Sequence, residues 1–289
     1  MADYTQEELK GLQQKSLEMA NYFVDFCQKN NLLCYFCGGG CIGAIRHKGF
    51  IPWDDDLDFF MPREDYERLE ILWEKENQGR YKLQKSNSEY IDHNSFITIR
   101  DAETTCIKPY QKELDIVHGI ALDILPLDGY PSSYVSRRLQ CMWALIYSLY
   151  CTQLIPEKHG KLMELGSKLL LGIVPSKKLR YKIWKFAERK MSLYKVSRCD
   201  SITELCSGPG YMRNRYPKSA FASAIYKEFE GHMMPIPIGY DQYLKIAFGD
   251  YMVMPPKEKR VAHHDALCLD FENSYKKYKG IYYCVEERK

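Results

Sequence analysis

The N-terminal part of the chain carries its hydrophobic residues at helical spacing. Over 5–30, leucine, methionine, phenylalanine and valine recur every three or four positions, and Thr5 precedes the acidic Glu7 and Glu8. A threonine followed by acids in the first turn is typical of a helix N-terminus. The same spacing returns over 63–76. The pattern therefore predicts two amphipathic helices, each with one face in the core.

Apolar runs that are too short for helices predict the strands. These runs are 32–36, 81–84, 96–100, 104–107 and 120–125. Asp128-Gly129 follows the last run and is typical of a turn. Strands interspersed with helices predict the fold class α/β (α+β), a small mixed sheet with flanking helices.

The pattern changes over 132–200, which is basic and helical in character. We interpret this range as a helical insertion. It separates a core at 1–131 from a C-terminal region at 201–289, which we expect to complete the site. Within the insertion, 139–155 contains no charged residue but is too short to span a bilayer, which needs ~20 apolar residues.

A helix over 139–155 would be apolar nearly all round, so its surface must be shielded from water. The sequence leaves open whether a membrane or other parts of the protein shield it. Arg137 and Arg138 precede this stretch, and the lysine-rich range 158–185 follows it. Apolar surface with flanking cations can lie in a membrane interface and be drawn to anionic lipids. The alternative is packing within the insertion or against a second copy, because most all-apolar helices are buried.

Composition narrows the class of protein. The 289 residues are 45% hydrophobic and 27% charged, as in a globular protein with one large domain or two small ones. A net charge of +3 gives no reason to expect nucleic acid as a partner. We expect no signal peptide and no membrane span, hence a cytoplasmic protein, at the inner face of the membrane if the insertion docks there. The eleven irregularly spaced cysteines then read as reduced thiols.

One stretch, 37–65, concentrates the candidate chemistry. The run Gly38-Gly39-Gly40 lets backbone N–H groups approach a ligand, because no Cβ intervenes. As a strand, the acidic run that follows would turn alternate carboxylates to one face, namely Asp54, Asp56 and Asp58, with Asp55 and Leu57 opposite. Carboxylates at this spacing suit a hard cation such as Mg²⁺. We therefore predict a phosphate-binding turn followed by a metal-binding strand.

Three other interpretations of this stretch compete. An acidic run is often a solvated turn, but apolar residues flank this one on both sides. An EF-hand loop would need glycine where Phe59 stands. A dinucleotide fingerprint matches at Gly38, Gly40 and Gly43, but the acidic residue that it needs further on is already part of the acidic run.

The segments 41–58 and 61–66 closely resemble the signature of the LicD family. These are phosphotransferases of the nucleotidyltransferase (polymerase-β-like) superfamily, related to fukutin and the fukutin-related protein. In that pattern Gly39-Gly40 resembles the glycine turn, and Asp56 and Asp58 resemble the paired acids. Asp123, an acid inside an apolar strand, resembles the third carboxylate. The family usually has threonine where this chain has Gly40, so a hydroxyl is missing there.

The resemblance implies transfer of phosphocholine, or a related alcohol phosphate, from a CDP-activated donor such as CDP-choline. The acceptor would be a sugar hydroxyl of a cell-surface glycan or a teichoic acid precursor, in some cases lipid-linked. Mg²⁺ or Mn²⁺ would be held by four carboxylates: Asp54, Asp56, Asp58 and Asp123. Asp56, Asp58 and Asp123 would be catalytic. The substrate would be bound by Gly39, Gly40, Arg46, Lys48 and Trp53.

A choline head would also need aromatic faces, and the sequence supplies several near the motifs: Trp53, Phe59, Tyr110, Tyr211, Tyr240 and Tyr243. The C-terminal segments 229–231, 235–244, 248–252 and 255–260 resemble further LicD motifs. His263 and His264 are candidates for a place near the substrate or for metal ligands.

Two rival functions share parts of this pattern. A nucleotidyltransferase that moves NMP to a small molecule, a protein or RNA would use the same fold and metals. A non-enzymatic glycan- or cation-binding module would keep the carboxylates without turnover. The nature of the product distinguishes the first rival, and the presence of turnover distinguishes the second.

Overall fold

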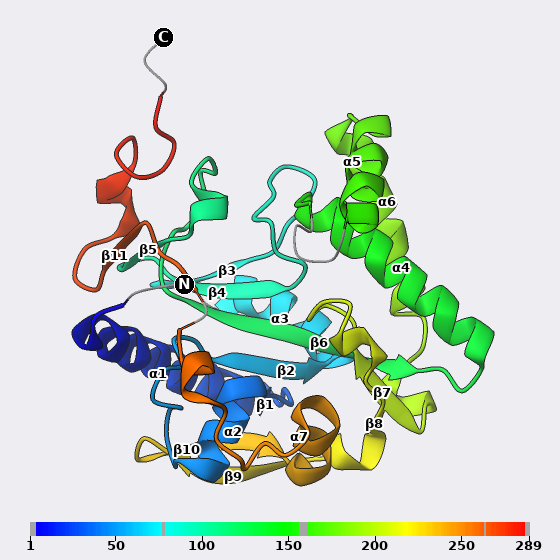
Figure 1. Cartoon of the computed structure of the whole chain (residues 1–289), viewed down its shortest axis with the longest axis horizontal. Coiled ribbons are helices and arrows are strands. Elements are labelled where there is room, and N and C mark those ends of the chain that lie inside the picture. Colours follow the sequence, from blue (N-terminus) through cyan, green and yellow to red (C-terminus); the bar gives the residue numbers. More distant parts are fainter. Residues whose placement is uncertain (1–3, 77–78, 156–160, 263, 287–289) are drawn as a thin grey trace.

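A mixed seven-stranded sheet forms the centre of the protein in the computed structural model, which describes residues 4–76, 79–155, 161–262 and 264–286. Five strands follow one another in the order β1-β2-β6-β4-β3, and β7 and β8 continue from β6 (Figure 1). β2 and β6 are parallel, and the other pairs are antiparallel. The strands are β1 Tyr35–Phe36, β2 Asp58–Pro62, β3 Tyr81–Gln84, β4 Ile97–Asp101, β6 Ala121–Tyr130, β7 Ser201–Glu204 and β8 Tyr216–Pro217.

Helices α1 Gln6–Lys29 and α3 Arg63–Glu76 cover one face of this sheet. Phe23 of α1 packs on Phe59 of β2 with ring centres 4.8 Å apart, and Phe26 packs on Trp73 of α3 at 4.6 Å. The predicted start of α1 is confirmed, because the Thr5 side chain accepts from the Glu8 N–H while Glu8 accepts from the Thr5 N–H. These reciprocal bonds satisfy backbone donors that a helix start leaves open.

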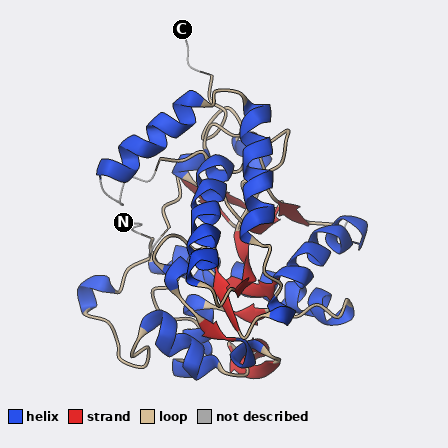
Figure 2. Cartoon of the chain, turned by 90° about the vertical axis from the view of Figure 1, so that its right-hand side faces the viewer, coloured by secondary structure: helices blue, strands red, loops and turns tan. Residues whose placement is uncertain are grey.

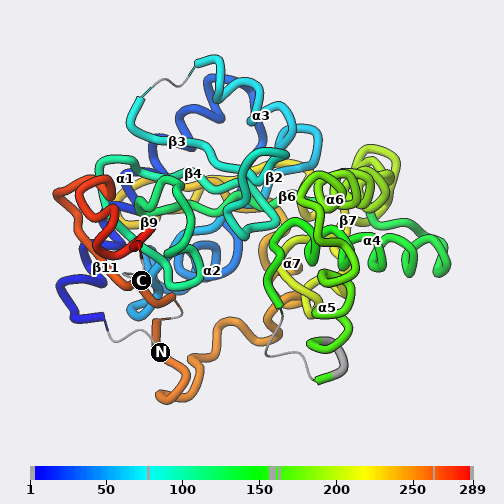
Figure 3. The backbone as a smooth tube through the Cα atoms, turned by 90° about the horizontal axis from the view of Figure 1, so that it is seen from above, coloured from blue at the N-terminus to red at the C-terminus, as the bar shows by residue number. Residues whose placement is uncertain are grey.

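The opposite face of β2 meets α7 Tyr240–Phe248, where Tyr243 packs on Phe60 at 5.8 Å. Figure 3 shows α3 on one side of the sheet and α2 Gly38–Arg46 on the other. Figure 2 shows the same layering, with helices on either side of the strands. The mixed α/β class predicted from the strand and helix pattern is thus confirmed.

Three helices occupy much of the range interpreted as an insertion: α4 Tyr134–Thr152, α5 Lys161–Ile173 and α6 Lys177–Met191. They stand together at one end of the sheet (Figure 1). Trp143 of α4 packs on Phe186 of α6 with ring centres 5.4 Å apart, and Tyr147 and Trp184 belong to a separate apolar cluster between the helices. Part of the uncharged stretch is therefore covered by the insertion itself. No helix in the described part of the chain is both long and apolar enough to cross a membrane.

The C-terminal part of the chain returns to the core. The hairpin β9 Ala224–Phe229 and β10 His232–Pro237 packs beside β1, where Phe229 meets Phe36 at 5.1 Å. Further on, β11 Cys268–Asp270 pairs with β5 Thr105–Ile107 (Figure 1). The segment between these two contacts crosses the acidic loop, as described below.

Two turns predicted from the sequence are wrong. The glycine run does not form only a turn, since it begins helix α2 directly after Cys37. Asp128-Gly129 is not a turn either, because it lies inside β6. Asp128 is buried there, and the guanidinium of Arg63 donates to both of its carboxylate oxygens, at 2.8 and 2.7 Å. A buried acid becomes tolerable inside a strand when a cation pairs with it in this way.

Candidate active site

A cavity of about 420 Å³ opens where the acidic run, the start of α2 and the C-terminal part of the chain meet. The carboxylates of Asp54, Asp56, Asp58 and Asp123 line it, and a fifth acid, Glu204, lies in the same wall. The other lining residues are Cys37, Gly38, Gly39, Ile51, Trp53, Phe60, Phe96, Leu125, Ser207, Tyr211, Tyr243, Phe248 and His264. A concave site with several convergent acids is a candidate active site.

Asp58 and Asp123 lie side by side in the wall of the cavity. Asp58 begins β2, and it is the register partner of Asp123 in the parallel strand β6. Because alternate residues of a strand share a face, Phe60 and Leu125 point the same way and also line the cavity. The sheet therefore fixes the direction of both carboxylates.

The acids at 54–57 lie in a loop that precedes β2, so the predicted strand begins only at Asp58. Leu57 is buried in the core and anchors this loop, while Asp56 and Asp58 on either side of it line the cavity. The Asp54 N–H donates to Ile51 O at 2.9 Å, which closes a turn at the start of the loop. The predicted alternation of Asp56, Leu57 and Asp58 thus holds although the backbone there is irregular.

The carboxylates of the cavity repel one another. Burial raises the pKa of Asp58 well above its ordinary value, and the neighbouring Asp56, Asp123 and Asp54 raise it further. Burial and the adjacent Asp56 and Asp55 raise the pKa of Asp54 in the same way. Oxygen donors crowded at one site are the ligands that Mg²⁺ and Mn²⁺ prefer. The side chains present therefore fit a divalent cation, whose charge would offset theirs.

Asp55 does not line the cavity, in agreement with the predicted face, but its carboxylate is bound by the C-terminal part of the chain. Its buried carboxylate accepts from the backbone N–H of His264 at 3.0 Å and lies 3.2 Å from His264 Nδ1. The same ring nitrogen is 3.5 Å from Asp56 Oδ2. Of the described residues, these three form a group whose potential ligand atoms lie within 4.8 Å of one another. Asp55 thus connects the C-terminal segment to the acidic loop. The other predicted histidine, His263, lies outside the described residues.

The start of α2 supplies backbone donors to the cavity. The first N–H groups of a helix have no partner within the helix. That of Gly38 donates to Tyr243 Oη at 3.0 Å. A Cβ at Gly39 would collide with the Asp54 carboxylate, so only glycine allows the helix start and the acid to come this close. A Cβ at Gly40 would instead lie 3.3 Å from Phe36 in the core, and Gly40 does not line the cavity.

Arg46 and Lys48 are placed away from the cavity. Arg46 is the last of the nine residues of α2, and Lys48 lies two residues beyond it. The start of α2 faces the acids, and a helix of nine residues is roughly 13 Å long. Arg46 Nη1 donates to Tyr251 O at 2.8 Å, and the exposed Lys48 ammonium lies 3.5 Å from Glu228. Neither side chain lines the cavity. Their predicted contact with phosphate has no support from this geometry.

Sequence reasoning missed two charged residues of the site. Glu204 ends a short buried strand, the same signal that drew attention to Asp123. Burial raises the pKa of both Asp56 and Asp58, and the positive charge of Lys108 offsets part of that rise. Burial lowers the pKa of Lys108 itself, but Tyr110 and Asp123 raise it by more, so it stays cationic. Lys108 thus contributes positive charge near the acids, and the His264 ring lies beside Asp55 and Asp56 from the C-terminal part of the chain.

Of the aromatic residues expected near a substrate, three line the cavity: Trp53, Tyr211 and Tyr243. The Arg260 guanidinium lies 5.7 Å from the centre of the Trp53 ring, so that ring already has a cationic neighbour. Phe59, Tyr110 and Tyr240 do not line the cavity. Phe59 faces the opposite side of β2, where it packs on α1.

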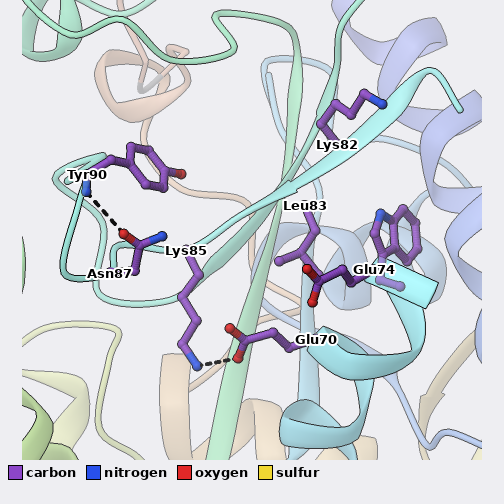
Figure 4. Close-up of a pocket in the computed structure, with 8 residues that line it drawn as sticks. Glu70, Glu74, Lys82, Leu83, Lys85, Asn87 and Tyr90 are labelled. Atoms are coloured by element: carbon purple, nitrogen blue, oxygen red, sulfur yellow. Dashed lines mark hydrogen bonds and ion pairs between the residues drawn. The ribbon is translucent and has the colours of Figure 1, made fainter. Parts of the chain in front are cut away.

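A second cavity, of about 490 Å³, lies at the outer edge of the sheet between α3 and β3 (Figure 4). It is lined by Glu70, Trp73, Glu74, Lys82, Leu83, Lys85, Asn87 and Tyr90. Lys85 Nζ lies 2.8 Å from Glu70 Oε2 and is paired, as Figure 4 shows. None of the family-motif acids reaches this cavity, so we place the chemistry in the first one.

The fold and the acidic cavity define an α/β protein with a clustered carboxylate site, and comparison with known proteins identifies its family. Residues 31–126 match the family described as LicD/FKTN/FKRP, nucleotidyltransferase domain. The lipopolysaccharide cholinephosphotransferase LicD of Haemophilus influenzae is 31% identical over 256 residues, which are 86% of this chain and 92% of that protein. The chain belongs to the LicD family.

Two shorter matches fall on uncharacterized proteins. That of Rickettsia typhi is 32% identical over 100 residues, which are 35% of this chain and 30% of that protein. That of Rickettsia prowazekii is 27% identical over 106 residues, which are 37% of this chain and 36% of that protein. Both are partial matches and say nothing about activity.

Proposed function

We propose that this protein transfers phosphocholine, or a related alcohol phosphate, from a CDP-activated donor to a sugar hydroxyl of a cell-surface glycan or a teichoic acid precursor. One observation carries the proposal: Asp58 and Asp123 lie together in a cavity that also receives the N-terminus of α2. Acids and helix-start donors are what a diphosphate and its metal need. The name of the Haemophilus influenzae relative, a lipopolysaccharide cholinephosphotransferase, supports the same chemistry.

The proposed cofactor is Mg²⁺ or Mn²⁺, held by Asp54, Asp56, Asp58 and Asp123. When bound, such an ion supplies charge neutralisation at the phosphates and lowers the pKa of the acceptor hydroxyl. Asp56, Asp58 and Asp123 are the proposed catalytic residues, because they lie where the reacting phosphorus would be held. The nucleotidyltransferase (polymerase-β-like) type of the fold is part of the same proposal.

The chain's own groups have separate tasks in this reaction. Backbone N–H groups at the start of α2, including that of Gly39, bind the diphosphate. The acceptor oxygen forms a bond to the phosphorus of phosphocholine, the bond from that phosphorus to CMP breaks, and a cavity carboxylate takes the acceptor proton. Trp53 lines the cavity and stays a proposed donor contact, whereas Gly40, Arg46 and Lys48 do not line it.

We further propose that the helical region touches an anionic membrane surface, at the inner face of a cytoplasmic membrane where a lipid-linked acceptor is available. α5 exposes Leu165, Leu169 and Ile173, with 67, 62 and 67% of each residue accessible, at helical spacing. Exposed lysines flank this row, among them Lys177 and Lys178 at the start of α6. An apolar row with a basic rim is the composition of an interfacial helix. Arg137 has no part in this surface, because it is buried and donates to Gln140, Thr203 and Met212.

The proposal is tested by following CMP release. The protein is incubated with Mg²⁺, a lipopolysaccharide acceptor and one of CDP-choline, CDP-ethanolamine, CDP-glycerol or CDP-ribitol. We expect CMP release from one of these donors, fastest from CDP-choline, and its loss in EDTA. Release of pyrophosphate from CTP, without CMP release from any CDP-alcohol, would support the rival nucleotidyltransferase. No turnover of either kind would support a binding module.

A further inference from the structure

We propose that the end of the cavity beyond the aspartates is the subsite for the donor's alcohol, and that it selects a quaternary ammonium group. The subsite consists of the Glu204 carboxylate and five rings, namely Phe60, Phe96, Tyr211, Tyr243 and Phe248, and we call it the aromatic subsite. This inference rests on the proposed function, because it names the alcohol that the same cavity accepts.

The two strands that carry the acid pair lead directly into the aromatic subsite. Phe60 lies two residues beyond Asp58 on the same face of β2, and Leu125 lies two residues beyond Asp123 on β6. One such step along a strand covers roughly 7 Å. Over that distance the side chains that line the cavity change from carboxylates to hydrocarbon groups. Choline has the same order along its length, with a phosphate ester at one end and a methylated nitrogen two carbons further on.

Among the described residues, Glu204 is a carboxylate without a cationic partner. It is buried, and it accepts hydrogen bonds from Tyr216 Oη and from Asn214 Nδ2. Within the described part of the chain, no lysine, arginine or histidine forms an ion pair with it, whereas Asp55, Asp56 and Asp128 each have such a partner. Burying a carboxylate is costly unless a positive charge accompanies it. A ligand cation would supply that charge.

The rings around Glu204 are inclined to one another and do not stack. Tyr211 and Phe248 have centres 6.1 Å apart at 60°, Tyr243 and Phe248 6.4 Å at 78°, and Phe60 and Tyr243 5.8 Å at 68°. Tyr211 and Phe248 are exposed, whereas Tyr243 is buried. Because these rings are inclined and line one cavity, a ligand group bound between them can contact the faces and edges of several rings. Cations over such faces gain ~0.5–2 kcal/mol per ring.

The polar groups of the aromatic subsite favour choline over the other candidate alcohols. A trimethylammonium group is a cation without N–H donors, so it needs rings and a nearby negative charge. The primary ammonium of ethanolamine would leave N–H donors against hydrocarbon, and the hydroxyls of glycerol or ribitol would lose hydrogen bonds to water. Trp53 is left out of the subsite because Arg260 already lies over its ring.

Binding measurements with CDP-choline and CDP test the inference. Titration calorimetry with Mg²⁺ present and no acceptor gives the ratio of the two dissociation constants. We expect the protein to prefer CDP-choline by about tenfold or more. Glu204→Gln keeps the shape of the side chain and should bring the preference within about twofold while leaving the affinity for CDP unchanged. Tyr211→Leu, at the rim, should reduce the preference without disturbing the core.

A matched control and the contrary outcomes make the test decisive. Tyr226→Leu changes an equally exposed tyrosine of β9 that does not line the cavity, and should keep the wild-type preference. If the wild-type protein binds CDP and shows no preference for CDP-choline, the aromatic subsite is wrong while the proposed function stands with another alcohol. If Glu204→Gln keeps the full preference, Glu204 has no such role. If the protein binds neither compound, the proposed function fails, and the subsite with it.

Discussion

Asp58 and Asp123 are register partners on the parallel strands β2 and β6, so the sheet itself sets two carboxylates side by side. Both face the cavity that also holds Asp54, Asp56 and the N-terminus of α2. Neighbouring carboxylates repel each other, and a cation bound between them offsets this repulsion. The central claim is that this pair binds the metal of a phosphocholine transferase.

The first prediction concerns this pair. Asp58→Asn and Asp123→Asn each remove a ligand charge without changing side-chain volume, so each should lower kcat by about a hundredfold or more. Without metal, each variant should be as stable as the wild-type protein or slightly more so, because one repulsion is gone. CMP release measures the first effect and thermal unfolding in EDTA measures the second. Full turnover in either variant would remove that residue from the mechanism.

The second prediction concerns Asp55, which the sequence placed on the face away from the site. Asp55→Ala removes the acceptor for the His264 N–H and the neighbour of its ring, at a cost of about 1–3 kcal/mol. We expect faster hydrogen exchange at 264–267 and lower turnover, although Asp55 does not line the cavity. Asp241→Asn, which weakens an exposed pair with Lys245, is the control and should leave that segment unchanged. Unaltered exchange at 264–267 in Asp55→Ala would show that Asp55 does not hold this segment.

The third prediction concerns the buried pair of Arg63 and Asp128. Asp128→Ala leaves the Arg63 guanidinium buried without its main partner, and should cost about 3–5 kcal/mol in the free energy of unfolding. Lys29→Ala, in an exposed pair with Glu76, should cost far less, because solvent screens that pair. Urea unfolding measures both. Equal small losses would mean that the β6 pair does not hold α3 on the sheet.

The fourth prediction concerns the apolar row of α5. With anionic vesicles at low salt the protein should float, and the double variant Lys177→Glu with Lys178→Glu should float markedly less. Lys276→Glu with Lys277→Glu changes two adjacent exposed lysines far along the chain, and is the charge-matched control. A wild-type protein that stays at the bottom of the gradient and sediments as a dimer would show that a second copy covers α5 instead.

Much of the secondary structure could be predicted from the sequence, because helix caps and apolar spacing depend only on residues that are neighbours along the chain. The cap at Thr5 and the apolar spacing predicted α1, and the apolar flanks of Asp123 predicted a strand. The glycine run was misjudged because glycine disfavours helices, whereas here the collision of any Cβ with Asp54 makes glycine necessary at the start of one.

Contacts between distant parts of the chain were beyond sequence reasoning. Asp128 looks like a turn residue until Arg63, from another element, is placed against it. Glu204 enters the cavity because β7 pairs with β6, and the sequence does not specify that long-range pairing, although it shows an acid at the end of a short apolar strand. Arg46 looked like a phosphate ligand by closeness in sequence, but α2 carries it away from the cavity.

The most direct test of the central claim is to determine which half of the donor reaches the glycan. CDP-choline labelled separately in the choline methyl groups and in the cytidine is incubated with the protein, Mg²⁺ and a lipopolysaccharide acceptor. The account predicts choline label and phosphorus in the glycan, an equal amount of free CMP, and neither product with Asp58→Asn or in EDTA. Cytidine label in the acceptor, or choline transfer that continues undiminished in Asp58→Asn, would contradict it.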